Sequence, residues 1–338
     1  MTKSAPTVPP GEGRGAVAHL PQVSPQAAAV DDLVTLRDFL RYAVSRFNVA
    51  KLVYGHGTAT ALDEAAFLLL SALDLPIDQL EPWLEARLVR SERERLAHLI
   101  EDRIATRKPA PYLVGKAWIK GHPFRVDERV IVPRSFIGEL LVESPEAFAG
   151  DPESVGSVLD LCTGSGCLAI LAALAFPQAR VDAVDISPDA LDVARANIAD
   201  YGLAERVTAR AGDLFSGLAG KRYDLVITNP PYVAAAEVAA FPPEYLAEPV
   251  LAHLGGDDGL DLVRRILAEA GSHLAPAGTL VVEFGTGREI LESEYPALPF
   301  QWLDTEMSEG EVFALAAGDL AGRSAPVASD GRRRRAKR

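Results

Sequence analysis

From Ser157 onward the chain alternates short apolar strands with helices, and this alternation constrains the fold more than any other feature. SVLDLC is followed by the turn TGSG and the helix CLAILAALAF, and VDAVDI is followed by SPDALDVARANIADYG. Three further strand-like runs are VTARAGDLF, YDLVITN and GTLVVEFG, and FQWLDTE with EVFALAAG forms a closing pair. Near-continuous apolar strands separated by helices indicate an α/β domain whose mostly parallel sheet is covered on both faces.

The chain before this domain has a different pattern. Residues 1–29 are rich in Pro, Gly and Ala without lasting periodicity, which predicts a disordered leader. Apolar residues then recur at helical spacing, and Ser91 is expected to be the N-cap of a third helix. Residues 30–109 are therefore expected to form a small helical domain, and residues 110–135 a β-hairpin linker. The α/β domain would span residues 136–318, followed by a basic disordered tail over 319–338.

The charge balance limits the partners of the protein. The formal net charge is −13, so the body of the protein is not expected to attract nucleic acid or an anionic membrane. The segment Arg332–Arg338 inverts this locally with six positive charges. It is interpreted either as a solvated tail or as an arm that contacts RNA.

Cysteine usage and hydropathy point to a reducing compartment. Cys162 and Cys167 are the only cysteines, and they lack the spacings expected of a zinc site, so no metal is predicted. The N-terminal segment has no apolar core of a signal peptide, and no apolar run reaches the roughly 20 residues of a membrane span. A cytoplasmic protein without membrane contact is expected.

In open α/β sheets, ligands bind beyond the carboxyl ends of the strands. At the first such end, Gly164 and Gly166 allow a tight turn and a close approach of the backbone to a ligand. Asp185 ends the second strand, where a carboxylate can accept both hydroxyls of a ribose. With Ala169 the glycines also match the dinucleotide pattern G-x-G-x-x-A, and a plain turn with a helix-capping Asp is the simpler alternative.

The third and fourth strand ends carry further polar groups. Asp213 could accept from an adenine amine with Leu214 beside the ring, although an Asp after a strand is usually a helix cap. The fourth end reads Asn229-Pro230-Pro231-Tyr232. The Asn229 side-chain oxygen and the Pro230 carbonyl can both accept from one planar NH₂ group, and the prolines hold these acceptors fixed. The Tyr232 ring offers a flat face on which an amide or a base can stack.

These residues together resemble the class I S-adenosylmethionine-dependent methyltransferases that modify planar nitrogens. That set includes adenine-N6 enzymes of nucleic acid and the glutamine-N5 enzymes of the HemK/PrmC/PrmB group. The resemblance rests on NPPY, DLCTGSG and Asp185, and it runs from about residue 32 to 316. It implies a Rossmann-like, seven-stranded, mostly parallel sheet. Three features favour the glutamine enzymes over the adenine enzymes: the net negative charge of the protein, the N-terminal helical domain, and the lack of an inserted target-recognition domain.

Within the glutamine enzymes, VPRSFIGEL (132–140), SRFN and YGHGT are similar to those that modify a large-subunit ribosomal protein, L-three, rather than release factors. The resemblance implies S-adenosylmethionine as cofactor and this ribosomal protein as partner. It does not cover the basic tail, which could contact ribosomal RNA if the substrate is met during ribosome assembly. It implies that the helical domain either docks the substrate or supports the core. Where the wider motif has its first Gly, this chain has Cys162.

The resemblance implies one set of residues for the cofactor and one for the substrate amide. The cofactor set is Cys162, Thr163, Gly164, Ser165, Gly166, Asp185, Ile186, Asp213, Leu214 and Asn229. The substrate set is Pro133, Arg134, Asn229, Pro230, Pro231 and Tyr232, of which Asn229, Pro230 and Tyr232 are expected to be catalytic.

An amide nitrogen is a poor nucleophile because its lone pair is delocalised into the carbonyl. Hydrogen bonds from its two protons to Asn229 and Pro230 would raise the electron density on nitrogen and align it with the methyl donor. None of the six His lies in a strand-end motif, so direct in-line transfer with later loss of the proton is expected. The alternatives are methylation of release factors, adenine-N6 methylation of nucleic acid, and a non-catalytic ribosome-assembly factor. A dehydrogenase is disfavoured because the fourth and fifth strands offer no hydride chemistry.

Overall fold

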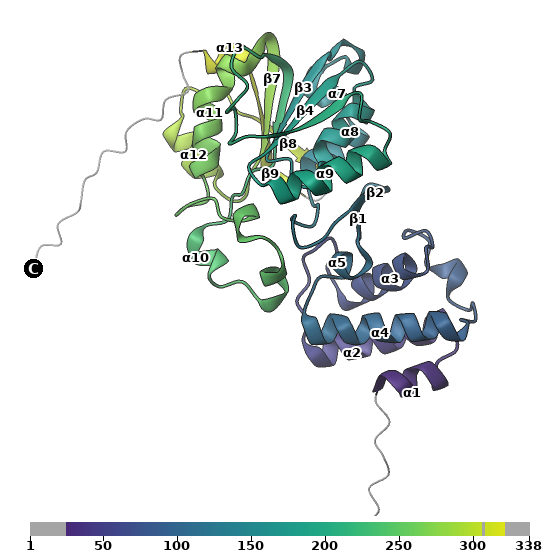
Figure 1. Cartoon of the computed structure of the whole chain (residues 1–338). Coiled ribbons are helices and arrows are strands. Elements are labelled where there is room, and N and C mark those ends of the chain that lie inside the picture. Colours follow the sequence, from purple (N-terminus) through teal and green to yellow (C-terminus); the bar gives the residue numbers. More distant parts are fainter. Residues whose placement is uncertain (1–24, 306–307, 322–338) are drawn as a thin grey trace, which may run out of the picture.

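The computed structural model describes residues 25–305 and 308–321 (Figure 1). A helical domain comes first. Its elements are α1 (Pro25–Asp32), α2 (Leu36–Ala50), α3 (Ala61–Ala72), the 3-10 turn η1 (Glu81–Trp83), α4 (Arg90–Thr106) and α5 (Ala110–Val114). Helix α2 begins at a capping box, in which Thr35 accepts from the backbone of Asp38 and Asp38 accepts from that of Thr35. Phe39 and Phe47 on its inner face are completely buried in the core of this domain.

A β-hairpin connects the helical domain to the sheet. Strand β1 (Lys116–Ile119) pairs with β2 (His122–Arg125) in antiparallel register. The chain then forms α6 (Phe136–Glu143), α7 (Glu146–Ala149) and the turn η2 (Pro152–Ser154). Residues 126–135, between β2 and α6, lie at the carboxyl ends of the sheet strands. Ser135, for example, donates to Glu283, the last residue of one of these strands.

The second domain is built on a seven-stranded sheet of order β5-β4-β3-β6-β7-β9-β8. Its strands are β3 (Ser157–Leu161), β4 (Arg180–Asp185), β5 (Val207–Ala211), β6 (Tyr223–Thr228), β7 (Leu274–Glu283), β8 (Gln301–Thr305) and β9 (Ser308–Ala316). The first five are parallel, and β9 is antiparallel to β7 and β8. The predicted seven-stranded, mostly parallel sheet with its closing pair is therefore confirmed.

Helices cover both faces of the sheet. One face packs against α6, α8 (Cys167–Ala175) and α9 (Pro188–Asp200), and buries Val158, Leu225 and Val281. The other packs against α11 (Asp261–His273), α12 (Arg288–Glu294) and α13 (Ala317–Leu320), and buries Leu159 and Val226. Adjacent strand residues such as Val158 and Leu159 point to opposite faces, so both must be apolar. This explains the near-continuous apolar strands of the sequence.

Between β6 and α11 the chain makes a long excursion that contains α10 (Ala235–Val238), η3 (Pro243–Ala247) and η4 (Val250–Ala252). In Figure 1 this segment extends from the sheet domain towards the helical domain. We refer to residues 233–260 as the bridging loop. Glu244 of this loop accepts hydrogen bonds from the Val53 backbone and from Arg107, both in the helical domain.

The structure differs from the sequence-based expectations at several boundaries. Helix α1 begins at Pro25, within the expected leader 1–29, because Ala29 and Val30 are buried in the helical core. Helix α4 begins at Arg90 with Val89 as its N-cap, so the assignment of Ser91 was wrong; Glu92 instead accepts from the Val89 backbone. The expected linker 110–135 starts with helix α5, and α13 crosses the expected boundary at residue 318. The basic tail Arg332–Arg338 and residues 1–24 lie outside the described residues.

Candidate active site

The strand order reverses between β3 and β6, which lie side by side and parallel. The chain continues from β3 to β4 and β5 on one side, whereas β6 and β7 extend the sheet on the other. Such a reversal leaves a crevice at the carboxyl ends of the two strands. The segments that follow these strands are Cys162–Gly166 and Asn229–Tyr232, and both contribute to the walls of cavities at this point.

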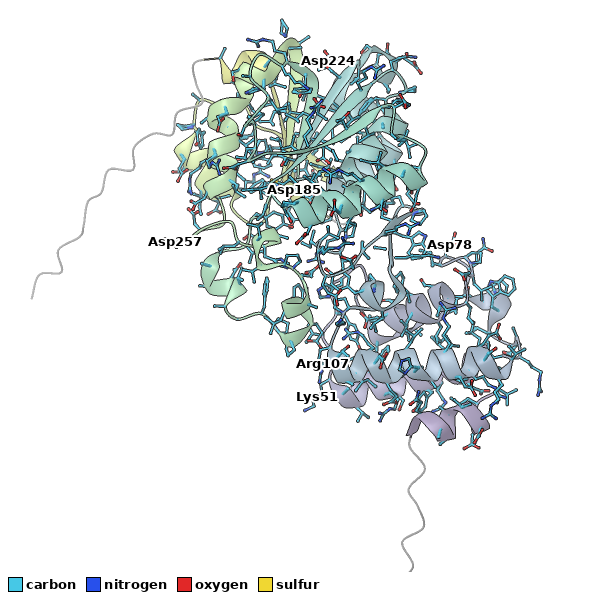
Figure 2. The ribbon with its side chains drawn as sticks, in the orientation of Figure 1. Lys51, Asp78, Arg107, Asp185, Asp224 and Asp257 are labelled. Atoms are coloured by element: carbon cyan, nitrogen blue, oxygen red, sulfur yellow. The ribbon has the colours of Figure 1, made fainter. Side chains whose placement is uncertain are left out.

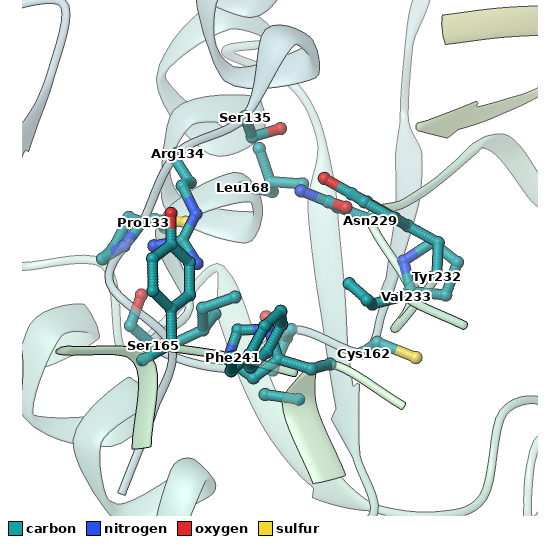
Figure 3. Close-up of a pocket in the computed structure, with 18 of the residues that line it drawn as sticks. Pro133, Arg134, Ser135, Cys162, Ser165, Leu168, Asn229, Tyr232, Val233 and Phe241 are labelled. Carbon is teal, nitrogen blue, oxygen red and sulfur yellow. The ribbon is translucent and has the colours of Figure 1, made fainter. Parts of the chain in front are cut away.

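Two cavities meet at this crevice. The first has a volume of about 360 Å³, and the second of about 430 Å³. The first, drawn in Figure 3, takes part of its lining from the segment before α6 and part from the bridging loop. The second extends towards the ends of β4 and β5. The residues that line both cavities are Ile131, Cys162, Gly164, Asn229 and Ala252.

The structure distributes the predicted site residues between these cavities. Those of the cofactor set that line the second cavity are Cys162, Gly164, Asp185, Ile186, Asp213, Leu214 and Asn229. Those of the substrate set that line the first are Pro133, Arg134, Asn229, Pro230 and Tyr232. Three residues lie elsewhere: Thr163 and Ser165 line the first cavity, and Pro231 lines the second. Gly166 lines neither cavity; it precedes α8 with φ +80°, and a Cβ there would lie 3.1 Å from that of Ala194.

The turn after β3 uses left-handed backbone at alternate positions. Cys162 has φ +56°, and Gly164 has φ +54°. The Thr163 amide between them donates to the Val184 carbonyl at 3.0 Å, which ties the turn to β4. A Cβ built on Gly164 would meet no atom within 4 Å, so this position opens into free space. The left-handed Cys162 explains why the wider motif has Gly at this place.

Two carboxylates in the second cavity differ in their surroundings. Asp185 accepts from the backbone amides of Gly164 (2.8 Å) and Ser187 (2.9 Å), one through each oxygen. Burial raises the pKa of Asp185, and these hydrogen bonds oppose the rise. Asp213 is exposed and accepts from Arg265 on α11 with both oxygens at 2.9 Å. Each carboxylate oxygen has more than one lone pair, so both groups can still accept from a ligand.

Asn229 is held by a carboxylate that sequence analysis did not single out. Its Nδ2 donates to Oε1 of Glu283 at 2.8 Å. Glu283 is the last residue of β7 and is only 1% exposed, and burial raises the pKa of Glu283 to about 7. Because Nδ2 is engaged, the amide oxygen of Asn229 is the end that remains for a ligand. A Glu that ends an apolar strand, as in VVEFG, is the signal that could have identified it.

Arg134 forms an ion pair that closes one wall of the first cavity. Its guanidinium donates to both oxygens of Glu248 on the bridging loop, at 3.0 and 2.8 Å. His253 and His56 lie 3.0 and 3.4 Å from the same carboxylate, and all three side chains apart from Arg134 are buried. Burial alone would raise the pKa of Glu248, but His253, His56 and Arg134 outweigh it and hold that pKa well below its usual range. Sequence analysis did not predict this cluster of Arg134, Glu248, His253 and His56.

The Tyr245 ring connects this cluster to the helical domain. It lies 4.3 Å from the ring of His56 and 5.8 Å from the guanidinium of Arg134. Together with Phe241 and His253, Tyr245 gives the first cavity an aromatic wall (Figure 3). Flat walls of this kind suit a planar amide or a base.

Residues 25–305 and 308–321 contain neither a membrane-spanning helix nor a metal-ligand cluster. No helix of this part of the chain is long and apolar enough to cross a membrane. Nor does this part contain a group of three or more His, Cys, Asp or Glu side chains arranged to hold a metal ion.

The chain is similar to known proteins over most of its length. Residues 140–243 match the family described as methyltransferase small domain. A ribosomal protein uL3 glutamine methyltransferase of Bradyrhizobium diazoefficiens is 56% identical, over 88% of this chain and 96% of its own length. Proteins of the same name from Bordetella pertussis and Burkholderia pseudomallei are 54% and 53% identical. These two alignments cover 84% and 85% of this chain, and 95% of each relative.

Proposed function

Because the chain belongs to the family of ribosomal protein uL3 glutamine methyltransferases, we propose that it transfers a methyl group from S-adenosylmethionine to the side-chain amide nitrogen of a glutamine in ribosomal protein uL3. The observation that carries this proposal is the meeting of two cavities at Asn229. Methyl transfer needs a donor site and an acceptor site that adjoin each other, so that the amide nitrogen and the methyl group can approach in line.

The second cavity suits the methyl donor. Its volume of about 430 Å³ lies within the range of about 300–1,000 Å³ that is usual for small-molecule sites. Asp185 would hold the ribose, while Ile186, Asp213 and Leu214 would border the adenine. The open left-handed turn at Cys162 and Gly164 would carry the methionine part. When bound, S-adenosylmethionine supplies a methyl group that its sulfonium activates.

The first cavity suits the glutamine side chain. The Asn229 oxygen and the Pro230 carbonyl would accept the two amide protons, which places the nitrogen beside the donor site and raises its electron density. Tyr232 would stack on the amide plane, and Pro133 and Arg134 would close the site from the opposite side. As the nitrogen–carbon bond forms, the bond between the methyl carbon and the sulfonium sulfur would break, its electron pair would return to sulfur to leave neutral S-adenosylhomocysteine, and the nitrogen would become positively charged and acidic. It then loses its proton to water, so no general base is required.

Replacing Asn229 tests the proposal. We expect Asn229→Ala to lower the rate of methyl transfer to purified uL3 by about 100-fold or more, the loss typical of removing one fixed polar group from an active site. Calorimetric titration with S-adenosylmethionine should give a nearly unchanged affinity, because Asp185 and the turn after β3 remain. Mass spectrometry of uL3 from cells that lack this chain should find one glutamine without its methyl group.

Asp224→Asn is a matched control. Asn229 directly follows the end of strand β6, whereas Asp224 lies near the start of the same strand. There the Asp224 carboxylate accepts hydrogen bonds from the Gly156 and Ser157 backbones. It should leave methyl transfer unchanged. Full activity of Asn229→Ala would overturn the assignment, and activity on a release factor but not on uL3 would overturn the substrate.

A further inference from the structure

The Glu283 side chain joins three segments that are far apart in the sequence. Its Oε1 accepts from Asn229 Nδ2 after β6. Its Oε2 accepts from Ser135 Oγ at 2.6 Å and from the backbone amide of Ile137 at 3.2 Å, both at the start of α6. The carboxylate therefore connects two residues that line the first cavity, Asn229 and Ser135. Figure 3 labels both of these residues.

This arrangement determines which end of the Asn229 amide faces a ligand. An ionised carboxylate only accepts hydrogen bonds, so the Asn229 oxygen cannot turn towards Glu283 without repulsion. In the neutral form, the proton can sit on Oε2 and donate to the Ser135 hydroxyl, so Oε1 remains an acceptor. With Glu283 ionised, or with its proton on Oε2, Asn229 is driven to point Nδ2 at Glu283 and to keep Oδ1 for the cavity.

We propose that Glu283 is a positioning residue that fixes the orientation of the Asn229 amide and thereby makes the site select glutamine over glutamate. This inference rests on the proposed function. With Asn229 so oriented, the Asn229 oxygen and the Pro230 carbonyl are two acceptors, which match the two protons of an amide and repel a carboxylate. With Asn229 turned over, its NH₂ group would oppose the substrate amide and attract a carboxylate instead.

The variant Glu283→Gln should favour the opposite orientation of the Asn229 amide with almost no change in side-chain size. Glutamine has one acceptor and one donor end, and the Ile137 amide can only donate, so the Gln oxygen is needed at the Oε2 position. The Gln NH₂ group then faces Asn229 and favours the turned-over orientation. We expect kcat with uL3 to fall by about 100-fold while the affinity for S-adenosylmethionine changes by less than about twofold.

A change of specificity separates positioning from a general structural role. Let the methylated glutamine of uL3 be replaced by glutamate, and let the affinities of both forms of uL3 be measured. The wild-type protein should prefer the glutamine form, and Glu283→Gln should reduce this preference by about tenfold or invert it. Glu283→Asp keeps an acceptor-only group at this place, so it should retain the preference even if its shorter side chain lowers kcat.

A measurement without substrate keeps the inference testable by itself. The side-chain NH₂ of Asn229 should be protected from exchange with water in the wild-type protein, because Glu283 holds it, and NMR can follow this exchange. Glu283→Gln should remove the protection, whereas Asp224→Asn should not. An unchanged protection or an unchanged glutamine preference in Glu283→Gln would overturn the inference. Protected Asn229 in a protein that does not methylate uL3 would instead overturn the proposed function alone.

Discussion

Cys162 is a residue of the site whose backbone conformation is one that a side chain with a Cβ rarely adopts. It has φ +56° in the turn that separates the two cavities. A left-handed conformation costs a residue with a Cβ about 1–2 kcal/mol, and a β-branched side chain tolerates it worst. The strained backbone thus lies in the wall of both cavities, a placement that is common at functional sites.

Cys162 already bears the cost of the left-handed conformation, so Cys162→Val adds only the extra strain of a β-branched side chain; we expect it to lower the free energy of unfolding by about 0.5–3 kcal/mol, the usual range for a destabilising substitution, and to weaken S-adenosylmethionine binding. Cys162→Gly should leave both nearly unchanged, because relief of strain is offset by the greater freedom of Gly in the unfolded chain. Urea denaturation and calorimetric titration measure the two effects. If the Val and Gly variants had the same free energy of unfolding and the same affinity for S-adenosylmethionine, the left-handed backbone at residue 162 would not determine either quantity.

Asp160 is a buried carboxyl under the same turn. Its Oδ2 accepts from Thr163 Oγ1 and the Ala169 backbone, and its Oδ1 has no partner among the described residues. Burial raises the pKa of Asp160 from 3.8 to about 7, although these hydrogen bonds oppose the rise. The folded protein therefore holds this proton more tightly than the unfolded chain does.

This pKa predicts the sign of a pH effect. Between pH 3.8 and about 7 the folded state binds more protons at Asp160, so its contribution to the free energy of unfolding falls as the pH rises. Asp160→Asn should remove this contribution and gain stability relative to the wild-type protein at about pH 8 compared with about pH 5. Urea denaturation at both pH values measures the difference. Glu283 also has a raised pKa, but it is present in both proteins, so its contribution cancels in the difference. If the free energy of unfolding changed equally with pH in both proteins, the raised pKa of Asp160 would be contradicted.

At the scale of elements, the sequence predicted the strands and their ends well, because periodicity and turn residues are local signals. The strand-end residues Asp185, Asp213 and Asn229 could be placed near one another because parallel strands end at one edge. Glu248 and His253 could not, since they lie in the bridging loop, which has no periodicity. The partners of Glu248 come from other segments, so only the folded chain brings them together.

The bridging loop is anchored to the helical domain by Glu244. This buried carboxylate accepts from the Val53 backbone at 3.1 Å and from Arg107 at 2.9 Å. Arg107 also donates to the carbonyls of Ala50 and Lys51 at the end of α2, and Figure 2 labels Lys51 and Arg107 close together there. The Arg107 side chain thus links the end of α2 to Glu244 of the bridging loop, and this loop lines the first cavity.

We expect Glu244→Ala to lower the free energy of unfolding by about 1–3 kcal/mol, because it leaves the Val53 amide and the Arg107 guanidinium without this acceptor. It should also raise KM for uL3 more than KM for S-adenosylmethionine, since the loop lines the first cavity. Asp257→Ala, an exposed change on the same loop (Figure 2), should alter stability by less than about 0.5 kcal/mol. If both variants behaved alike, the loop would not depend on this anchor.

At the scale of the whole molecule, the first cavity is shared by parts that are distant in the sequence. The segment before α6 supplies Arg134, the end of β6 supplies Asn229, and the bridging loop supplies Tyr245 and His253. The helical domain reaches this wall through His56. Of the two roles expected for the helical domain, docking the substrate or supporting the catalytic core, its contact with this wall favours the second.

The charge of the whole chain predicts how it meets its substrate. Taking the six positive charges of Arg332–Arg338 from the formal net charge of −13 leaves −19 on residues 1–331. A ribosomal protein that binds RNA phosphates must be rich in Lys and Arg, so the acidic body should attract it over a long range. Salt shortens that range from about 30 Å at 0.01 M to about 3 Å at 1 M.

We therefore expect kcat/KM for free uL3 to fall by about tenfold or more between low and high salt, with a much smaller change in the affinity for S-adenosylmethionine. A chain that ends at Gly331 lacks the positive charges of the tail. It should associate faster with free uL3 at low salt, because a source of like-charge repulsion has been removed. If the tail contacts ribosomal RNA, the same truncation should instead slow methylation of uL3 that is presented with its RNA. A rate on free uL3 that did not respond to salt would show that docking depends on shape rather than on charge.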